Sequence, residues 1–458
     1  MVRKNDLIEF NIDKVAFPDK GEGEYEGHKI KFKGGIEGQK VEAKVGRKRK
    51  DYIEAKIINV LEKSPLETET GCPHFRACGG CAHQTLAYED ELKLKEKQVL
   101  DLFAKDGLDI NYLGIERSPI VQGYRNKMEY TFGDEEKEGP LALGLHSKGK
   151  FYEIVNVRHC NIVDADFTNI LTIILKYFQQ LNMPHYKKKT HEGFLRHLVI
   201  RKALSTGEIL INIITSSQRQ LDSDDFVSNI MKKSGMFKGK IVGILHTIND
   251  SLSDVVKADR LEILYGRDYI VEEILGLKFN ISPFSFFQTN TLGAERLYSI
   301  VREFAGDVDD KIIFDLYSGI GAIAQIMAPM AKKVIGIEIV EEAVSKAREN
   351  AELNNLNNVE FMCGDVLKMV DELEDKPDLI IIDPPREGIQ PKAIRKIIDF
   401  NPEKFIYVSC NPVTLVRDLK VFVERGYKID KVQCMDQFPR TVHVESIILM
   451  TYCGSREK

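Results

Sequence analysis

The stretch that decides the fold class is Ile312-Ile313-Phe314-Asp315-Leu316-Tyr317-Ser318-Gly319-Ile320-Gly321. Its apolar first half is typical of a strand buried in a parallel sheet. Its glycines allow backbone N–H groups to approach a ligand near the start of the next helix. Nineteen residues after Gly319, the next expected strand ends at Glu338, whose carboxylate can accept hydrogen bonds from a ribose. The stretch therefore predicts a nucleotide-like cofactor at the end of a parallel sheet.

Alternating strands and helices surround this stretch. We expect a helix at 341–354, and strands at 311–317, 333–338, 358–363, 378–383, 403–409, 427–435 and 444–452. Such alternation is the pattern of a doubly wound parallel sheet. We therefore assign residues 281–458 to one α/β domain.

Two cofactor classes fit the glycine loop. Residues 319–324 also match the relaxed GxGxxG/A fingerprint of dinucleotide-binding proteins, which is a weak motif by itself. S-adenosylmethionine is favoured because the loop opens a complete alternating sheet in the C-terminal part of the chain. It is also favoured because the fourth strand ends in Asp383-Pro384-Pro385-Arg386, where the prolines fix a rigid turn. The alternative interpretation of Asp383 is a simple helix N-cap.

A cysteine lies where a later strand ends, in Ile406-Tyr407-Val408-Ser409-Cys410-Asn411-Pro412. Open α/β sheets bind ligands outside the carboxyl ends of their strands, so this thiol faces the expected cofactor crevice. The alternative is an ordinary buried cysteine. Glu445 opens the last expected strand, and taken alone it would be a solvated residue at the sheet rim.

Together, a thiol and a carboxylate supply what methylation of uracil at C5 requires. C5 of uracil is a poor nucleophile until a thiolate adds to C6. A base must then remove the C5 proton, so that the thiol can leave. Cys410 is the candidate nucleophile and Glu445 is the candidate base.

The composition is that of an ordinary soluble protein. Of the 458 residues, 43% are hydrophobic and 29% are charged, which suits about two to four domains. No apolar run approaches the ~20 residues of a membrane span, and the N-terminus lacks the apolar core of a signal peptide. We therefore expect a cytoplasmic protein without a membrane partner. There, the eight cysteines are poor candidates for structural disulfides.

The first part of the chain is expected to be mainly β. Residues 1–63 show short alternating segments separated by glycines, which predicts a small barrel. Residues 64–280 follow, mainly with strands and hairpins, and with helices near 86–103 and 167–181. We find no internal repeat.

A cysteine cluster lies in this middle part. Cys72, Cys78 and Cys81 are spaced as CxxxxxCxxC, and Cys160 follows later in the chain. Four thiolates fit a four-sulfur zinc site or a [4Fe–4S] cluster, and the spacing leaves both open. Two nearby histidines are further possible zinc ligands. The cysteines assigned to the core, because they fall in expected strands, are Cys363, Cys434 and Cys453.

The combined motifs resemble those of the RNA uracil-C5 methyltransferase family. The resemblance covers nearly the whole chain and is to members with an N-terminal TRAM domain and an iron–sulfur cluster, the 23S ribosomal RNA (uracil-5-)-methyltransferase type. The motifs that carry it are Phe286-Phe287-Gln288-Thr289-Asn290, Asp315 to Gly321, Asp383-Pro384-Pro385-Arg386, Ser409-Cys410-Asn411-Pro412 and His443-Val444-Glu445.

This resemblance implies an organisation of the chain. It implies a Rossmann-like class I methyltransferase domain at 281–458 and an OB-like TRAM barrel at 1–63. A mainly β central domain at 64–280 would bind RNA and carry the iron–sulfur loop. The helix near 86–103 is expected to pack on the catalytic domain. The protein is expected to be a monomer.

The resemblance also assigns roles to residues. It implies that Cys410 is the nucleophile and Glu445 the general base. A [4Fe–4S] cluster would be held by Cys72, Cys78, Cys81 and Cys160. S-adenosylmethionine would be contacted by Gln288, Tyr317, Gly319, Glu338 and Asp383. Orientation of the uracil is the alternative role for the last of these carboxylates.

RNA is the expected substrate, with uridine C5 in 23S ribosomal RNA as the target. The T-loop uridine of transfer RNA is the alternative target. A non-catalytic RNA-binding iron–sulfur protein and an NAD-dependent oxidoreductase are alternatives of other classes. The net charge of −5 predicts no overall affinity for nucleic acid, and the basic clusters at 44–50 and 187–189 are either solvated loops or binding surfaces. Gly123-Tyr124-Arg125-Asn126-Lys127 suits base stacking and phosphate contact, or an ordinary strand start. Residues that wall a base pocket, or belong to the core, are Phe284, Phe286 and Phe287.

Overall fold

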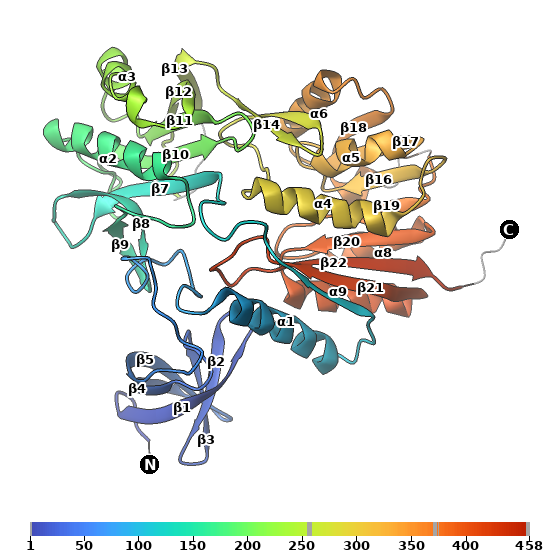
Figure 1. Cartoon of the computed structure of the whole chain (residues 1–458), viewed down its shortest axis with the longest axis horizontal. Coiled ribbons are helices and arrows are strands. Elements are labelled where there is room, and N and C mark those ends of the chain that lie inside the picture. Colours follow the sequence, from blue (N-terminus) through green and yellow to red (C-terminus); the bar gives the residue numbers. More distant parts are fainter. Residues whose placement is uncertain (1, 254–258, 370–372, 374, 455–458) are drawn as a thin grey trace.

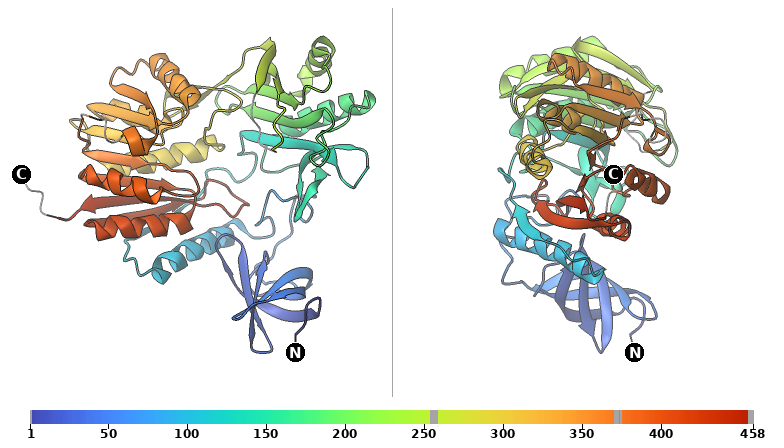
Figure 2. Two further views of the ribbon diagram at one scale, coloured as in Figure 1. Left: turned by 180° about the vertical axis from the view of Figure 1, so that it is seen from behind. Right: turned by 90° about the vertical axis from the view of Figure 1, so that its right-hand side faces the viewer.

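A computed structural model of the chain describes residues 2–253, 259–369, 373 and 375–454. A closed β-barrel lies at one end, and two domains built of helices and a sheet lie side by side beyond it (Figure 1). Helix α1 (Tyr88–Lys105) lies between the barrel and the C-terminal domain, as the views from behind and from the side also show (Figure 2).

The C-terminal domain is built on an eight-stranded sheet with the order β18-β17-β16-β19-β20-β22-β21-β6. Its strands are β6 (Tyr112–Glu116), β16 (Ile312–Leu316), β17 (Lys333–Glu338), β18 (Val359–Cys363), β19 (Leu379–Ile382), β20 (Lys404–Ser409), β21 (Tyr427–Met435) and β22 (Glu445–Tyr452). Strand β22 is antiparallel to both of its neighbours. The strand order reverses between β16 and β19, which is where open α/β sheets bind ligands.

The eighth strand of this sheet comes from an earlier part of the chain. Strand β6 pairs in parallel with β21, with Val432 opposite Tyr112. The residues of β6 do not alternate cleanly between buried and exposed, so its sequence carries no strand period. Helix α1, which precedes β6, buries Val99 and Phe103 in the same core. The sheet therefore takes one helix and one strand from the 64–280 part of the chain.

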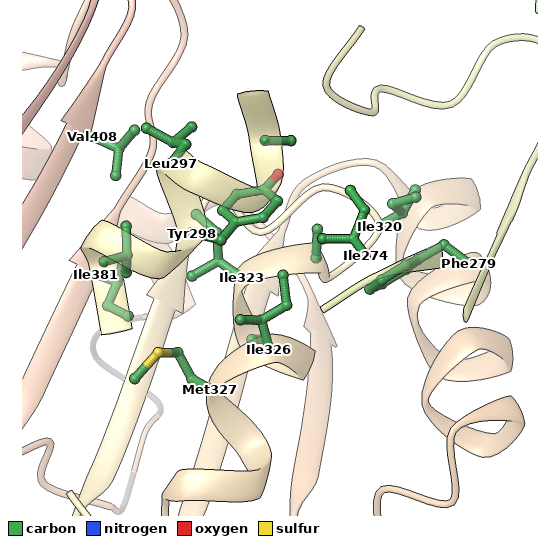
Figure 3. Packing of buried hydrophobic residues seen from close by; sticks show 14 of the residues in the cluster. Ile274, Phe279, Leu297, Tyr298, Ile320, Ile323, Ile326, Met327, Ile381 and Val408 are labelled. Atoms are coloured by element: carbon green, nitrogen blue, oxygen red, sulfur yellow. The ribbon is translucent and has the colours of Figure 1, made fainter. Parts of the chain in front are cut away.

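Helices cover both faces of the C-terminal sheet. One face is covered by α4 (Thr291–Ala305), α5 (Ala322–Met327), η2 (Ala328–Met330) and α6 (Glu341–Leu353), and the other by α1, α7 (Val366–Met369), α8 (Pro391–Asp399) and α9 (Pro412–Glu424). In the first layer, Tyr298 of α4 lies beside Ile323 of α5, and Leu297 of α4 lies beside Val408 of β20 (Figure 3). Burial on both faces explains why strands such as β19 are continuous apolar runs.

The central domain is built on a seven-stranded sheet with the order β13-β12-β11-β10-β7-β8-β9. Its strands are β7 (Lys127–Asp134), β8 (Leu141–Ser147), β9 (Lys150–Asn156), β10 (Leu195–Lys202), β11 (Glu208–Thr215), β12 (Lys240–Ile248) and β13 (Arg260–Gly266). Helices α2 (Ala165–Gln180) and α3 (Ser223–Met231) bury their apolar faces against it, and η1 (Ser234–Met236) follows. A hairpin of β14 (Ile270–Ile274) and β15 (Leu277–Ile281) then packs on the first helical layer of the C-terminal domain.

Five strands close the small barrel that was expected at the N-terminus, in the order β1-β2-β3-β5-β4. They are β1 (Leu7–Ala16), β2 (Lys20–Tyr25), β3 (His28–Lys33), β4 (Lys40–Lys48) and β5 (Ile53–Glu62). Buried and exposed residues alternate along β1, so that Ile8, Phe10 and Ile12 fill the interior. Among the described residues, no helix is long and apolar enough to cross a membrane.

Helix α1 fixes the barrel relative to the C-terminal sheet. Gln98 Nε2 donates a hydrogen bond to Val15 O at 2.9 Å, and Leu94 packs against the barrel core. Val99 and Phe103 lie in the core beneath the C-terminal sheet. Helix α1 thus makes two apolar contacts, one with the barrel and one with the C-terminal domain.

Candidate active site

The register of the C-terminal sheet brings Cys410 and Glu445 to the same end of the sheet. Strands β20 and β22 pair antiparallel, and Ser409 and Ser446 are their last pair. Cys410 follows Ser409 just beyond the end of β20, and Glu445, the first residue of β22, precedes Ser446. Burial and the charge of Glu445 raise the pKa of the Cys410 thiol, so the two side chains are near each other. The carboxyl end of β20 therefore carries a thiol beside a carboxylate.

A second carboxylate joins them from the neighbouring strand. In the parallel pair β19 and β20, Ile382 lies opposite Tyr407, and Asp383 directly follows β19. The charge of Asp383 raises the pKa of Glu445, and both carboxylates raise the pKa of Cys410. The three groups therefore form one electrostatic unit at the end of the sheet.

The Asp383-Pro384-Pro385-Arg386 turn is tied directly to the cysteine turn. Asn411 Nδ2 donates to Arg386 O at 2.9 Å, and Asn411 Oδ1 accepts from Val413 N at 3.2 Å as the N-cap of α9. Pro412 occupies the first turn of that helix, where no N–H is required. Arg386 is held close enough to donate a hydrogen bond to the Cys410 sulfur. The asparagine of the cysteine motif thus couples the two loops.

Removal from water sets the protonation of all three groups. Burial raises the pKa of Asp383 to about 7. Burial and the charge of Asp383 raise the pKa of Glu445 to about 8. Burial and both carboxylates raise the pKa of the Cys410 thiol to about 12, against the opposing effect of Arg386. These shifts favour the protonated form of each of the three groups in the free protein.

The glycine loop after β16 has a strained backbone with one open position. Tyr317, Gly319 and Gly321 have φ values of 65°, 56° and 74°. A Cβ on Gly321 would lie 2.4 Å from Phe361 Cζ, so only glycine fits there. A Cβ on Gly319 would meet no heavy atom of the described residues within 4 Å. The space beside Gly319 is therefore open to a ligand.

Glu338 lies across this loop at the end of β17. Its Oε2 accepts a hydrogen bond from Gly319 N, and its Oε1 accepts one from Val340 N, both at 3.0 Å. Asp315 supports the loop from below, because its Oδ2 accepts from Ala324 N at 2.9 Å. Burial raises the pKa of Asp315 well above its usual value, and the charges of Asp383 and Glu338 raise it further. The glycine loop and the thiol site are therefore adjacent.

Gln288 approaches from the loop between β15 and α4. Gln288 is 6% exposed, and its backbone carbonyl oxygen accepts a hydrogen bond from Asn126 Nδ2 at 3.2 Å. The guanidinium of Arg201, buried in the central domain, holds the same loop by donating to Pro283 O at 3.2 Å and to Ser285 O. The central domain therefore fixes the loop that carries Gln288.

The four candidate metal-ligating cysteines line one cavity of about 460 Å³. Gly80 N donates to Cys78 Sγ, and Gln84 Nε2 donates to Cys81 Sγ, both at 3.4 Å. Burial, with small contributions from neighbouring thiols, raises the pKa of Cys81 to about 12 and that of Cys160 to about 11. Thiols are the donors of zinc and iron–sulfur sites, and two of these four sulfurs accept N–H groups. Among the described residues, no three His, Cys, Asp or Glu side chains form a ready metal-binding group.

This cavity also reaches the catalytic region. Arg125, Phe286 and His443 line it together with the cysteines. Phe286 is 70% exposed, whereas Phe287 is buried in the core. Burial lowers the pKa of His443, and the positive charge of Arg386 lowers it further. This histidine is therefore near the Cys410 loop. The cysteine cluster and the catalytic loops thus face a common hollow.

Several residues of the site have no signal in the sequence analysis. Tyr298 of α4 is buried, and the charges of Asp383 and Glu445 contribute to its raised pKa, so it lies near the catalytic carboxylates. Its helical spacing is that of an ordinary core residue. Arg386 and Asn411 lie inside motifs that the sequence revealed, but their pairing depends on two loops meeting in space.

The sheet order, the glycine loop and the acidic end of β17 define a Rossmann-like S-adenosylmethionine-dependent methyltransferase. Comparisons with known proteins narrow the class. A family model described as tRNA (uracil-5-)-methyltransferase matches residues 204–452. An uncharacterized RNA methyltransferase of Caldanaerobacter subterraneus subsp. tengcongensis is 54% identical over 448 residues, which cover 98% of this chain and 99% of that protein. Another, of Clostridium tetani, is 55% identical over 448 residues, covering 98% of each. The chain belongs to the RNA uracil-C5 methyltransferase family.

A solved structure matches the whole architecture. It is the Pyrococcus abyssi tRNA (uracil-54, C5)-methyltransferase in complex with S-adenosyl-L-homocysteine. The TM-score is 0.77 at 26% identity, and the match covers 96% of this chain and 99% of that one. The methyltransferase fold and S-adenosylmethionine dependence expected from the sequence are confirmed, whereas the iron–sulfur cluster stays a prediction.

The raised pKa of Glu445 has a consequence for stability. A carboxyl with a higher pKa in the folded protein holds its proton more firmly there, so its contribution to stability is lost as the pH rises from about 4.5 through about 8. Glu445→Gln removes this titration. As the pH rises from 5 to 9, we expect the free energy of unfolding of the variant to increase by a few kcal/mol relative to that of the unaltered protein. Urea unfolding across this range measures it, with the exposed Glu424→Gln as control. Parallel profiles for Glu445→Gln and the unaltered protein would contradict the assignment.

Proposed function

We propose that this protein methylates C5 of a uridine in RNA through a covalent adduct between Cys410 and C6 of the base. The observation that carries the proposal is that Cys410, Glu445 and Asp383 lie at one end of the sheet, where β20, β22 and β19 are neighbours, and influence one another's pKa values. A nucleophile and a base near each other at the open end of a methyltransferase sheet suit this reaction. A purely structural role would not require two carboxyls with raised pKa values beside a thiol.

The reaction needs a thiolate, so the Cys410 thiol must first release its proton to solvent. The Arg386 hydrogen bond and positive charge favour the ionised sulfur. The Cys410 thiolate adds to C6, and the electron pair of the C5–C6 double bond moves into an enolate that makes C5 nucleophilic. S-adenosylmethionine, when bound, supplies an electrophilic methyl group for C5.

The second half of the reaction belongs to Glu445. Its ionised carboxylate removes the C5 proton, the C5–C6 double bond re-forms, and the sulfur leaves C6 as thiolate. Burial and the charge of Asp383 raise the pKa of Glu445 to about 8, so this carboxyl must lose its proton before it can act; once ionised, it is a stronger base than an ordinary carboxylate. Asp383 in its protonated form would donate a hydrogen bond to a uracil carbonyl, which stabilises the enolate.

S-adenosylmethionine would lie over the glycine loop. The open space at Gly319 would admit the part of the cofactor that lies against the loop backbone. Glu338 accepts one hydrogen bond from Gly319 N and has lone pairs left to accept others from ribose hydroxyls. Tyr317 and Gln288 would contact the cofactor as well, as the sequence resemblance implies. Asp383 would contact either the cofactor or the uracil.

RNA would be held by the barrel and the central domain. The basic cluster at 44–50 lies at the exposed end of β4 and the following turn. The second basic cluster, 187–189, lines another cavity of about 450 Å³ together with the exposed Tyr152, and Lys189 Nζ lies 4.6 Å from the centre of that ring. Cations beside exposed aromatic rings suit phosphates and unstacked bases.

The proposed substrate is 23S ribosomal RNA, as the sequence resemblance implies. A second candidate, the T-loop of transfer RNA, is favoured by the match to the archaeal tRNA (uracil-54, C5)-methyltransferase. The two candidates share the chemistry and differ in the RNA that reaches Cys410.

The cysteine cavity is proposed to hold a [4Fe–4S] cluster on Cys72, Cys78, Cys81 and Cys160, with a structural or RNA-docking role. The N–H groups directed at two of the sulfurs support this, because such bonds stabilise thiolates carrying negative charge.

Anaerobically purified protein should contain iron and acid-labile sulfide in equal amounts. Cys81→Ser should lower both. Cys453, expected in the core, is in fact exposed just after β22, and Cys453→Ser should lower neither. Elemental analysis with sulfide determination is the measurement. Stoichiometric zinc in place of iron would replace this proposal by the four-sulfur zinc site.

Two substitutions separate nucleophile from base. Cys410→Ala should lower methylation by about 10³-fold or more, because no adduct can form. Glu445→Gln should complete methyl transfer but not release the RNA, so a slowly migrating protein–RNA band should accumulate on a denaturing gel. Cys453→Ala is the control and should behave as the unaltered protein. Normal turnover by both active-site variants would leave a non-catalytic RNA-binding protein as the better description.

Unmodified 23S ribosomal RNA and transfer RNA transcripts, each incubated with labelled cofactor, test the substrate. We expect label at uridine C5 in the ribosomal transcript. Mapping the methylated position identifies the target nucleotide. Label in transfer RNA alone would establish the second candidate, and label in neither RNA would contradict the proposed function.

A further inference from the structure

Residues 436–443 connect β21 to β22 and end two residues before Glu445; we refer to them as the joint. The joint is held from three sides. Asp436 N donates to Glu116 O of β6 at 2.8 Å, and Tyr124 of the central domain donates its hydroxyl to Pro439 O at 2.9 Å. Gln437 Nε2 donates to Asn290 O, before α4, at 3.2 Å. This short segment is therefore where the domains meet.

Helix α1 holds the joint through a buried ion network. Lys95 Nζ lies 2.6 Å from Asp436 Oδ1 and 2.8 Å from Glu91 Oε1, and all three side chains are fully buried. The same ammonium donates to Phe438 O at 3.3 Å. An unpaired charge here would be costly, so the joint can occupy only the position that keeps Lys95 and both carboxylates together.

Arg440 is the residue of the joint that reaches farthest. Its backbone N donates to Glu91 Oε1 at 2.6 Å, and its Nη1 donates to Leu86 O at 2.7 Å. Its carbonyl oxygen accepts hydrogen bonds from Ala82 N at 2.9 Å and His83 N at 3.0 Å. These donors directly follow Cys81. Arg440 therefore connects the cysteine loop, α1 and the strand that carries Glu445.

The backbone of Arg440 shows that this connection is costly to keep. Its φ is 71°, in the left-handed region that favours glycine or asparagine. A non-glycine residue persists there when surrounding contacts over-determine its conformation. A glycine at this position would lack the contacts that the guanidinium makes with Leu86 O and Glu91.

We propose that the Arg440 side chain positions the base for the reaction: its contacts with His83 O, Leu86 O and Glu91 hold the joint against α1 and the segment after the cysteine loop, and so set the place from which Glu445 removes the C5 proton. The inference rests on the proposed function, because it assigns the base step to Glu445. From Arg440 only four residues lead to that buried carboxylate, and the intervening backbone is fixed by His443 N donating to Thr441 Oγ1 at 3.2 Å. A displacement of about 1 Å at a reacting group can cost about 10²-fold in rate.

The test separates methyl transfer from proton removal. RNA transcribed with tritium at uridine C5 releases tritium only when the C5 proton leaves, whereas labelled S-adenosylmethionine reports methyl transfer to the same base. Transcripts of 23S ribosomal RNA and of transfer RNA serve as probes, and the one methylated by the unaltered protein is used. The experiment is run under single-turnover conditions with the full-length protein.

Arg440→Gly removes the side chain while suiting the left-handed backbone, so the fold is the least disturbed. We expect methyl transfer to stay within about 3-fold of the unaltered protein and tritium release to slow by about 10-fold or more. A covalent protein–RNA band should accumulate, as for Glu445→Gln. Arg440→Lys keeps the charge near Glu91 but not the guanidinium geometry, and it should show the same imbalance to a smaller degree. Arg425→Ala, which removes an arginine that pairs with Asp399 on the surface, is the control and should change neither rate.

The outcomes distinguish this inference from the function on which it rests. If Glu445→Gln itself gives no adduct, the proposed function fails. If Glu445→Gln gives adduct while both Arg440 variants slow methyl transfer and tritium release equally, or slow neither, the positioning role is overturned and the proposed function stands. Thermal unfolding of each variant shows whether it is folded at the assay temperature. Should Arg440→Gly be unfolded there, the Arg440→Lys result alone decides the inference.

Discussion

The buried ammonium of Lys95 is the interaction on which the architecture depends. It lies between Glu91, on its own helix, and Asp436, which is 341 residues away in the chain. A buried ammonium costs several kcal/mol unless carboxylates and hydrogen bonds surround it closely. Helix α1 must therefore dock where Asp436 is, and the C-terminal sheet, the barrel and the cysteine loop are placed by that docking. The same contact fixes the segment that leads to the candidate base.

The candidate site lacks the compensating charges that surround Lys95. Lys95 is buried with compensating charges, whereas the buried Glu445 lies near the partly buried Asp383 and Cys410, and these three groups repel one another when ionised. Such a site favours neutral carboxyls and a neutral thiol in the free protein.

Much of this arrangement was visible in the sequence. The glycine loop after Leu316, the acidic end of β17 and the cysteine turn predicted a methyltransferase sheet, because each is a local pattern at the end of an apolar run. The N-terminal barrel followed from alternating residues and glycine turns. Strand β6 was not predicted, since an edge strand with one partner needs no clear alternation. Tyr298 was not predicted, since its spacing on α4 is that of the core.

The sequence by itself determined which chemistry the chain carries, because a thiol, a carboxylate and a glycine loop are each written in a few consecutive residues. Only the tertiary structure decided how they work together. The antiparallel pairing of β20 and β22 brings Cys410 and Glu445 to the same end of the sheet, Asn411 joins the Arg386 loop to the cysteine turn, and Arg440 meets the cysteine loop. Each of these contacts joins residues more than twenty positions apart, and such contacts depend on packing and charge pairing that no local pattern records.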